Sequence, residues 1–184
     1  MGASKTIGSG EIQAAIARLA AAINARHRTP DGLLLLGIAN GGIELACRLA
    51  RLTSARAGVL DISFHRDDIA RRPIPQERAP THIPADVNDA TVLLIDDVLF
   101  SGRTVKAALD ELFDHGRPRL VELAVLIDRG GRRLPLAADY VGLTLAAGET
   151  ERVEVLLDTT SPRHDRIRVL PAAEDSPPRA PRPA

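Results

Sequence analysis

The chain has 184 residues, of which 45% are hydrophobic and 2% aromatic, and its 24 Lys and Arg balance its 24 Asp and Glu. These values are typical of one globular domain, and the zero net charge argues against a whole-protein electrostatic grip on nucleic acid or on an anionic membrane. A single cysteine, Cys47, leaves no disulfide framework and no cysteine-based zinc site. No apolar run approaches the roughly 18 residues that span a bilayer, so we expect a cytoplasmic protein with no membrane partner.

The order of the predicted elements indicates the fold class. Residues 1–9 are expected to form a flexible N-terminus that ends in Ser9, the N-cap of a helix over 10–27. An apolar run over 33–38 predicts a strand buried on both faces, and a glycine turn leads from it into a helix over 43–52. Further strands are expected over 58–64, 91–95, 121–127, 140–145, 153–157 and 167–170, with a helix that ends near residue 114. This alternation predicts an α/β fold with an open, mainly parallel sheet flanked by helices.

Two segments lack such periodicity. The polar, proline-rich stretch from residue 66 to 88 has no helical periodicity, so it is either disordered or a functional lid. After residue 170 the chain contains mostly Ala, Pro and charged residues, so we expect a folded domain over 10–170 and a disordered tail over 171–184.

The stretch after the strand over 91–95 has the composition of a sugar-phosphate site. Asp96 and Asp97 follow the strand directly, and Ser101 to Thr104 open the next helix. The free N–H groups of a helix start, next to a glycine and a Thr hydroxyl, suit a phosphate group. Two carboxylates would repel that phosphate, so they should face ribose hydroxyls or a metal ion. The alternative is a strand end with solvated acids followed by an ordinary N-capped helix.

Residues 92–104, Val-Leu-Leu-Ile-Asp-Asp-Val-Leu-Phe-Ser-Gly-Arg-Thr, resemble the signature by which type I phosphoribosyltransferases bind phosphoribosyl pyrophosphate (PRPP). Stretches at 58–62, 66–68, 126–130 and 138–142 extend this resemblance to the PyrR family of pyrimidine operon attenuation regulators, which are also uracil phosphoribosyltransferases. The resemblance covers residues 16–170. It implies the type I phosphoribosyltransferase fold with a lid loop and a small hood, and a homodimer or a higher homo-oligomer.

The resemblance implies transfer of the phosphoribosyl group from PRPP to uracil, with Mg²⁺ on the pyrophosphate near Asp96 and Asp97, to give UMP and pyrophosphate. The catalytic residues would be Asp96, Asp97 and Arg66. The substrate-binding residues would be Val98, Leu99, Phe100, Ser101, Gly102, Arg103, Thr104, Asn40, Gly41, Gly42, Asp128 and Arg129. Phe100 stands where phosphoribosyltransferases for 6-oxopurines commonly have an Asp, which favours a pyrimidine base.

Two departures from the family pattern keep alternatives open. The loop at Asn40, Gly41 and Gly42 lacks the cationic side chains that the family places on pyrophosphate, so the chain could instead be a catalytically weak sensor of UMP or PRPP that binds pyrimidine operon mRNA. A phosphoribosyltransferase for another base is a third reading. The family's basic RNA-binding face would be supplied here by Arg18, Arg26 and Arg132, although several other positions of that face are not basic.

Overall fold

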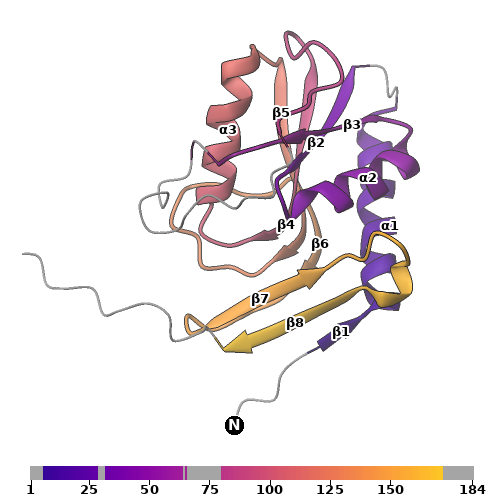
Figure 1. Cartoon of the computed structure of the whole chain (residues 1–184), viewed down its shortest axis with the longest axis vertical. Coiled ribbons are helices and arrows are strands. Elements are labelled where there is room, and N and C mark those ends of the chain that lie inside the picture. The colour runs from indigo at the N-terminus through magenta and orange to yellow at the C-terminus, as the bar shows by residue number, and fades with distance from the viewer. Residues whose placement is uncertain (1–5, 29–31, 64, 66–79, 172–184) are drawn as a thin grey trace, which may run out of the picture.

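The computed structural model describes residues 6–28, 32–63, 65 and 80–171 of the chain (Figure 1). In chain order the elements are β1 (Thr6–Gly8), α1 (Ser9–Arg26), β2 (Leu33–Ile38), α2 (Gly42–Thr53), β3 (Arg56–Leu60), β4 (Thr91–Leu99), α3 (Arg103–His115), β5 (Leu120–Asp128), β6 (Tyr140–Thr144), β7 (Glu151–Leu156), the short 3-10 helix η1 (Pro162–His164) and β8 (Arg166–Pro171). No helix in these ranges is long and apolar enough to cross a membrane.

The central sheet has five parallel strands in the order β3-β2-β4-β5-β6. Strand β2 is buried along its whole length because helices cover both of its faces. Leu33 and Leu35 pack with α1 and α2, whereas Leu34 and Leu36 point to the opposite face and pack with α3. Figure 1 shows this arrangement, with α3 on one side of the sheet and α1 and α2 on the other. The predicted α/β class with a mainly parallel sheet is confirmed.

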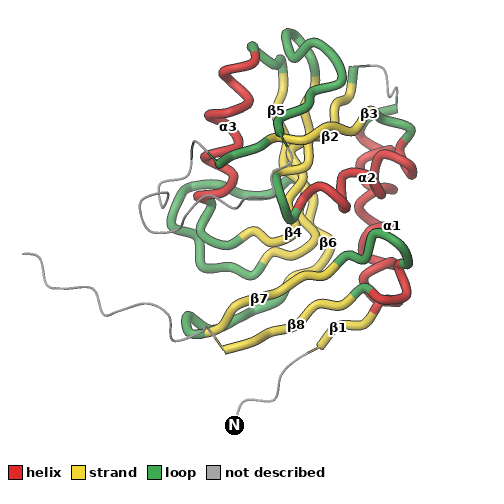
Figure 2. The backbone as a smooth tube through the Cα atoms, in the orientation of Figure 1, coloured by secondary structure: helices red, strands yellow, loops and turns green. Residues whose placement is uncertain are grey.

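A second, antiparallel sheet lies below the central sheet and corresponds to the expected hood (Figures 1 and 2). Its strand order is β1-β8-β7, so the first and last described strands pair with each other. Thr6 pairs with Arg168 and Gly8 with Arg166. We call this three-stranded sheet the hood.

The structure corrects several predicted boundaries. Residues 6–8 form β1 rather than part of a flexible terminus, because β8 supplies them with a hydrogen-bonding partner from the far end of the chain. Gly8 rather than Ser9 is the N-cap of α1. Strand β3 begins two residues earlier than predicted and ends at Leu60. Strand β8 includes Pro171, which we had placed in the tail. Residues 1–5 and 172–184, and most of the expected lid, lie outside the described residues.

Strand β4 is longer than its apolar run predicts, and this extension positions the acids. The apolar run ends at Ile95, but the strand continues to Leu99 because β5 pairs with it along its length. Asp96 faces Val125 of β5, and Leu99 faces Asp128. The acid pair therefore lies within a rigid strand and not in the loop beyond it.

Candidate active site

Asp96 and Asp97 lie at the carboxyl end of β4, on the edge of a parallel sheet where such folds bind ligands. Asp96 is 5% exposed, while Asp97 is half-buried. The backbone N–H of Asp97 donates to Oδ1 of Asp96 at 3.0 Å. Burial raises the pKa of Asp96 well above its ordinary value, and the charge of Asp97 raises it further. Within the described residues neither carboxylate has an ion-pair partner, so the pair is suited to a ligand that brings hydroxyl donors or a cation.

The glycine loop, residues 39–42, packs directly against this acid pair. A Cβ atom on Gly41 would lie 2.6 Å from Cγ of Asp97, and one on Gly42 would lie 2.0 Å from the carbonyl oxygen of Ile95. The Ala39–Asn40 peptide bond is cis. Only glycine allows the backbone at residues 41 and 42 to approach β4 this closely. The glycine loop departs from the family pattern, but it still contacts the predicted catalytic carboxylate of Asp97.

The phosphate loop, residues 100–104, leads from β4 into α3. Gly102 is the N-cap of α3 and has a φ of 91°, a left-handed conformation that favours glycine. The Ser101 hydroxyl accepts a hydrogen bond from the backbone N–H of Arg103 at 3.4 Å. No acidic residue occupies the first turn of α3, so nothing there offsets the partial positive charge of the helix start. Together with the Thr104 hydroxyl, this loop has the features of an anion site.

Phe100 and Arg129 form the side of the site next to the hood. The Arg129 guanidinium carbon lies 4.1 Å from the centroid of the Phe100 ring. Arg129 also donates to the carbonyl oxygens of Gly148 and Glu151, both at 3.0 Å. Phe100 is 37% exposed, and a Cβ on Gly131 would lie 2.6 Å from its ring. The packing of this ring therefore joins the phosphate loop to the hood.

Two further residues, Arg66 and Asp128, are also predicted to belong to the site. Arg66 lies outside the described residues, so its catalytic role stays a prediction. Asp128 is described, and both of its carboxylate oxygens have partners within the protein: Oδ1 accepts from the N–H of Gly130 at 2.8 Å and Oδ2 from Arg132 at 2.5 Å. Val98 and Leu99 contribute to β4, and Leu99 is buried.

The three arginines proposed for RNA all have partners within the protein. Arg18 donates to the carbonyl oxygen of Gly142 at 3.1 Å, and Arg26 forms an ion pair with Glu122 at 2.6 Å. Arg132 donates to backbone carbonyls and to Asp128. RNA binding through these residues would have to compete with these contacts, and it stays a prediction.

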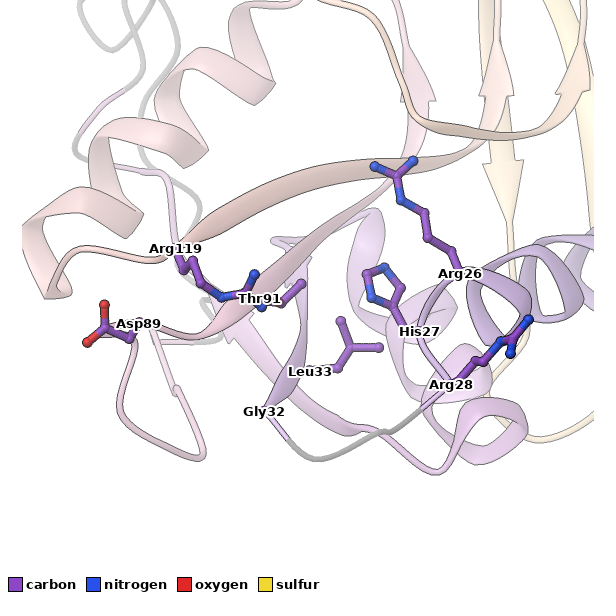
Figure 3. Close-up of a pocket in the computed structure, with 8 residues that line it drawn as sticks. All are labelled: Arg26, His27, Arg28, Gly32, Leu33, Asp89, Thr91 and Arg119. Carbon is purple, nitrogen blue, oxygen red and sulfur yellow. Dashed lines mark hydrogen bonds between the residues drawn. The ribbon is translucent and has the colours of Figure 1, made fainter.

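A separate cavity of about 290 Å³ lies at the opposite edge of the sheet, where β2 and β4 begin (Figure 3). It is lined by Arg26, His27, Arg28, Gly32, Leu33, Asp89, Thr91 and Arg119. Glu122 already pairs with Arg26 and His27, in each case at 2.6 Å, and Arg119 donates to the Thr91 hydroxyl at 2.7 Å. Arg26 and His27 thus share the Glu122 carboxylate, and the predicted catalytic and substrate-binding residues lie at the other edge of the sheet.

Sequence reasoning missed a buried link between α2 and the hood. Arg48 donates to Asp165 at 2.5 and 3.1 Å, to Glu44 at 2.7 Å and to the carbonyl oxygen of Asp158 at 2.6 Å. Asp165 is 3% exposed. The sequence contains no signal for this contact. Arg48 and Asp165 are 117 residues apart, and many other pairs of Arg and Asp in the chain could equally be proposed.

Comparison with known proteins identifies the family of this chain. The model of the phosphoribosyl transferase domain family matches residues 8–156. The chain is 46% identical to the Bifunctional protein PyrR of Deinococcus radiodurans over 163 residues, covering 84% of this chain and 87% of that protein. It is 43% identical to the Bifunctional protein PyrR of Chloroflexus aurantiacus over 183 residues, covering 95% and 100%.

Solved structures extend the comparison to the fold. The hypoxanthine phosphoribosyltransferase of Trypanosoma cruzi superposes with a TM-score of 0.64 at 21% identity, covering 90% of this chain and 95% of that chain. A hypoxanthine-guanine phosphoribosyltransferase from Bacillus anthracis superposes with a TM-score of 0.60 at 19% identity, covering 77% and 83%. The fold, the site at the end of β4 and the near full-length relatives together show that this chain belongs to the PyrR family of type I phosphoribosyltransferases.

Proposed function

We propose that this protein transfers the 5-phosphoribosyl group of PRPP to uracil, giving UMP and pyrophosphate. One observation carries the proposal: the phosphate loop, the acid pair and the glycine loop meet at a single edge of the sheet, with the Gly41 Cα position packed against Asp97. A sugar phosphate with a second phosphate group at C1 needs these three features side by side. The PyrR relatives support uracil as the base.

Each of the three features would bind a different part of PRPP. In the reaction the bond between C1 and the pyrophosphate oxygen breaks, a bond from C1 to N1 of uracil forms, and the N1 proton is lost. The phosphate loop would hold the 5-phosphate through the start of α3. Asp96 and Asp97 would accept hydrogen bonds from the ribose hydroxyls and stabilise the positive charge that develops on the sugar. The glycine loop would bind the leaving pyrophosphate through backbone N–H groups.

The acid pair also fits Mg²⁺. Carboxylate oxygens are hard ligands, and Mg²⁺ is commonly bound by one or two carboxylates together with substrate phosphates. Asp97, the more exposed of the two acids, would hold the ion together with oxygens of PRPP. When bound, Mg²⁺ would offset the charge of the leaving pyrophosphate. The loop lacks cationic side chains at 40–42, so the protein would depend strongly on this ion.

An assay of labelled uracil with PRPP and Mg²⁺ tests the proposal directly. We expect UMP from the wild-type protein and a loss of at least 100-fold in kcat/KM for Asp97→Asn and, separately, for Thr104→Ala, with both variants folded. No UMP at any PRPP concentration would refute the proposal, and full activity in both variants would refute the site. Hypoxanthine and guanine in parallel reactions test whether another base is preferred.

Thermal shift gives a second readout that needs no turnover. A ligand that binds the native state raises its melting temperature, by an amount that corresponds to about 2.7 kcal/mol at 100 times its Kd. We expect PRPP with Mg²⁺ and UMP to stabilise the protein, and GMP to have a smaller effect. A weak enzyme that senses UMP would show the UMP shift with little product in the assay.

A regulatory function is the second candidate, because the curated relatives are named bifunctional. A gel shift of pyrimidine operon leader RNA, with and without UMP, tests it. Retention that increases with UMP supports regulation by attenuation, and no retention in either condition contradicts it.

A further inference from the structure

We infer that Arg132 is a positioning residue for the phosphate loop, an inference that rests on the proposed function. Its side chain is only 22% exposed. Nη1 donates to the carbonyl oxygen of Leu99 at 3.1 Å and to that of Phe100 at 2.8 Å, and Nε donates to the carbonyl oxygen of Leu136 at 3.2 Å. One side chain thus binds the carbonyl group of the last residue of β4 and that of the first residue of the loop.

The backbone next to Arg132 also binds the phosphate loop. The carbonyl oxygen of Ser101 accepts hydrogen bonds from the N–H groups of Arg133 at 3.0 Å and Leu134 at 3.1 Å. A Cβ on Gly102 would lie 3.3 Å from Cβ of Leu134. Three consecutive carbonyl groups, at residues 99, 100 and 101, are therefore bound by the segment that follows β5.

This arrangement has a direct electrostatic consequence. A phosphate group is repelled by carbonyl oxygens and attracted by N–H groups, so a loop that binds phosphate must keep its carbonyl groups turned away. Arg132 fixes the carbonyls of Leu99 and Phe100 in that orientation and reduces their negative potential. Asp128 holds Arg132 in turn, because its Oδ2 accepts from Nη2 at 2.5 Å.

The family resemblance also places Arg132 on an RNA-binding face, and the two roles make different predictions. A residue that binds RNA phosphates contributes its charge at the surface, where any nearby arginine would serve. Arg132 contributes directed hydrogen bonds to named carbonyl groups, which a single charge cannot replace. Arg133 is the matched control: it is adjacent and exposed, and its side chain makes no hydrogen bond or ion pair within the described residues.

The test compares Arg132→Met, Arg132→Lys and Arg133→Met by calorimetric titration with PRPP and Mg²⁺, and with pyrophosphate as a ligand that lacks the 5-phosphate. For Arg132→Met we expect the Kd for PRPP to rise tenfold or more, because charge-assisted hydrogen bonds are lost, while the Kd for pyrophosphate stays within twofold. Arg132→Lys should recover part of the affinity, since one ammonium group can bind one carbonyl. Arg133→Met should bind PRPP like the wild type.

Hydrogen exchange of the Arg129 and Leu134 amides, which donate to the carbonyl oxygens of Leu99 at 3.2 Å and Ser101 at 3.1 Å, is measured without ligand and separates this inference from the proposed function. We expect exchange to accelerate about tenfold or more in Arg132→Met and not in Arg133→Met. If the wild type fails to bind PRPP, the proposed function fails while the exchange result still decides the role of Arg132. Unchanged exchange, or equal losses of PRPP affinity in both Met variants, would overturn the inference.

Discussion

At the residue scale, Gly41 shows how a missing side chain can place the carboxylate of Asp97, the predicted catalytic residue. Its φ of −65° is open to any residue, so steric contact alone restricts this position. The carboxylate of Asp97 occupies the space that a Cβ atom would need. The glycine therefore determines where this carboxylate can lie, although it contributes no functional group of its own.

We predict that Gly41→Ala lowers kcat/KM for PRPP at least tenfold with little change in stability, because the Asp97 side chain can rotate away and the backbone is unstrained. Gly10→Ala is the control: it lies in the first turn of α1 with nothing within 4 Å of the new Cβ, and should leave both activity and stability close to those of the wild type. Steady-state kinetics and urea unfolding measure both effects. Wild-type kinetics for Gly41→Ala would contradict the assigned position of Asp97.

Tyr140 gives a prediction about pH dependence that can be measured without an activity assay. Burial, and then the charge of Glu122, raise the pKa of Tyr140 from 10.0 to about 12. The folded protein thus holds the phenol proton more tightly than the unfolded chain, and the resulting stability is complete below pH 10 and is lost as the pH rises toward 12. Because the chain has one Tyr and no Trp, ultraviolet absorbance of phenolate reports on this residue alone. A midpoint near 10 in the folded protein would contradict the prediction.

At the scale of elements, arginine side chains connect the segments around the site. Helix α2 begins at the glycine loop, and Arg48 in the same helix binds Asp165, which lies between η1 and β8. Arg129 fastens the hood to the phosphate loop through Phe100. The hood is thereby connected to two sides of the site by arginine side chains.

We predict that Arg48→Met destabilises the protein by about 3–5 kcal/mol, because it leaves the buried Asp165 carboxylate without its cation. Arg51→Met, an exposed position in the same helix, removes the same charge and should change stability by less than about 0.5 kcal/mol. Denaturant unfolding measures the difference. Adding Asp165→Asn to Arg48→Met should recover part of the loss, and simple additivity of the two substitutions would contradict a direct pair.

At the scale of the whole molecule, the zero net charge affects the expected binding of RNA more than that of PRPP. The proposed phosphate site would depend on the start of α3, which the net charge does not affect. RNA binding depends on the number of cations that reach the backbone, and Arg18, Arg26 and Arg132 are all engaged within the protein.

We therefore predict a shallow salt dependence for any leader RNA complex. With about three phosphate contacts, log K should fall with log salt with a slope of about −2 to −3. Gel shifts between about 50 and 200 mM salt measure this slope. A slope of about −6 or steeper would show a basic surface larger than the one formed by these arginines.

The sequence by itself determined the α/β class, the buried strand β2 and the start of α3 after Gly102, because each depends on neighbouring residues: apolar side chains on both faces of one strand, or a glycine at the start of one helix. Only the tertiary structure decided which distant segments meet. It brought Gly41 against Asp97, paired residues 6–8 with β8, and placed the Arg132 guanidinium on the carbonyl groups of Leu99 and Phe100. An arginine can bind any carbonyl or carboxylate within reach, so its partner follows from the topology and not from its local sequence.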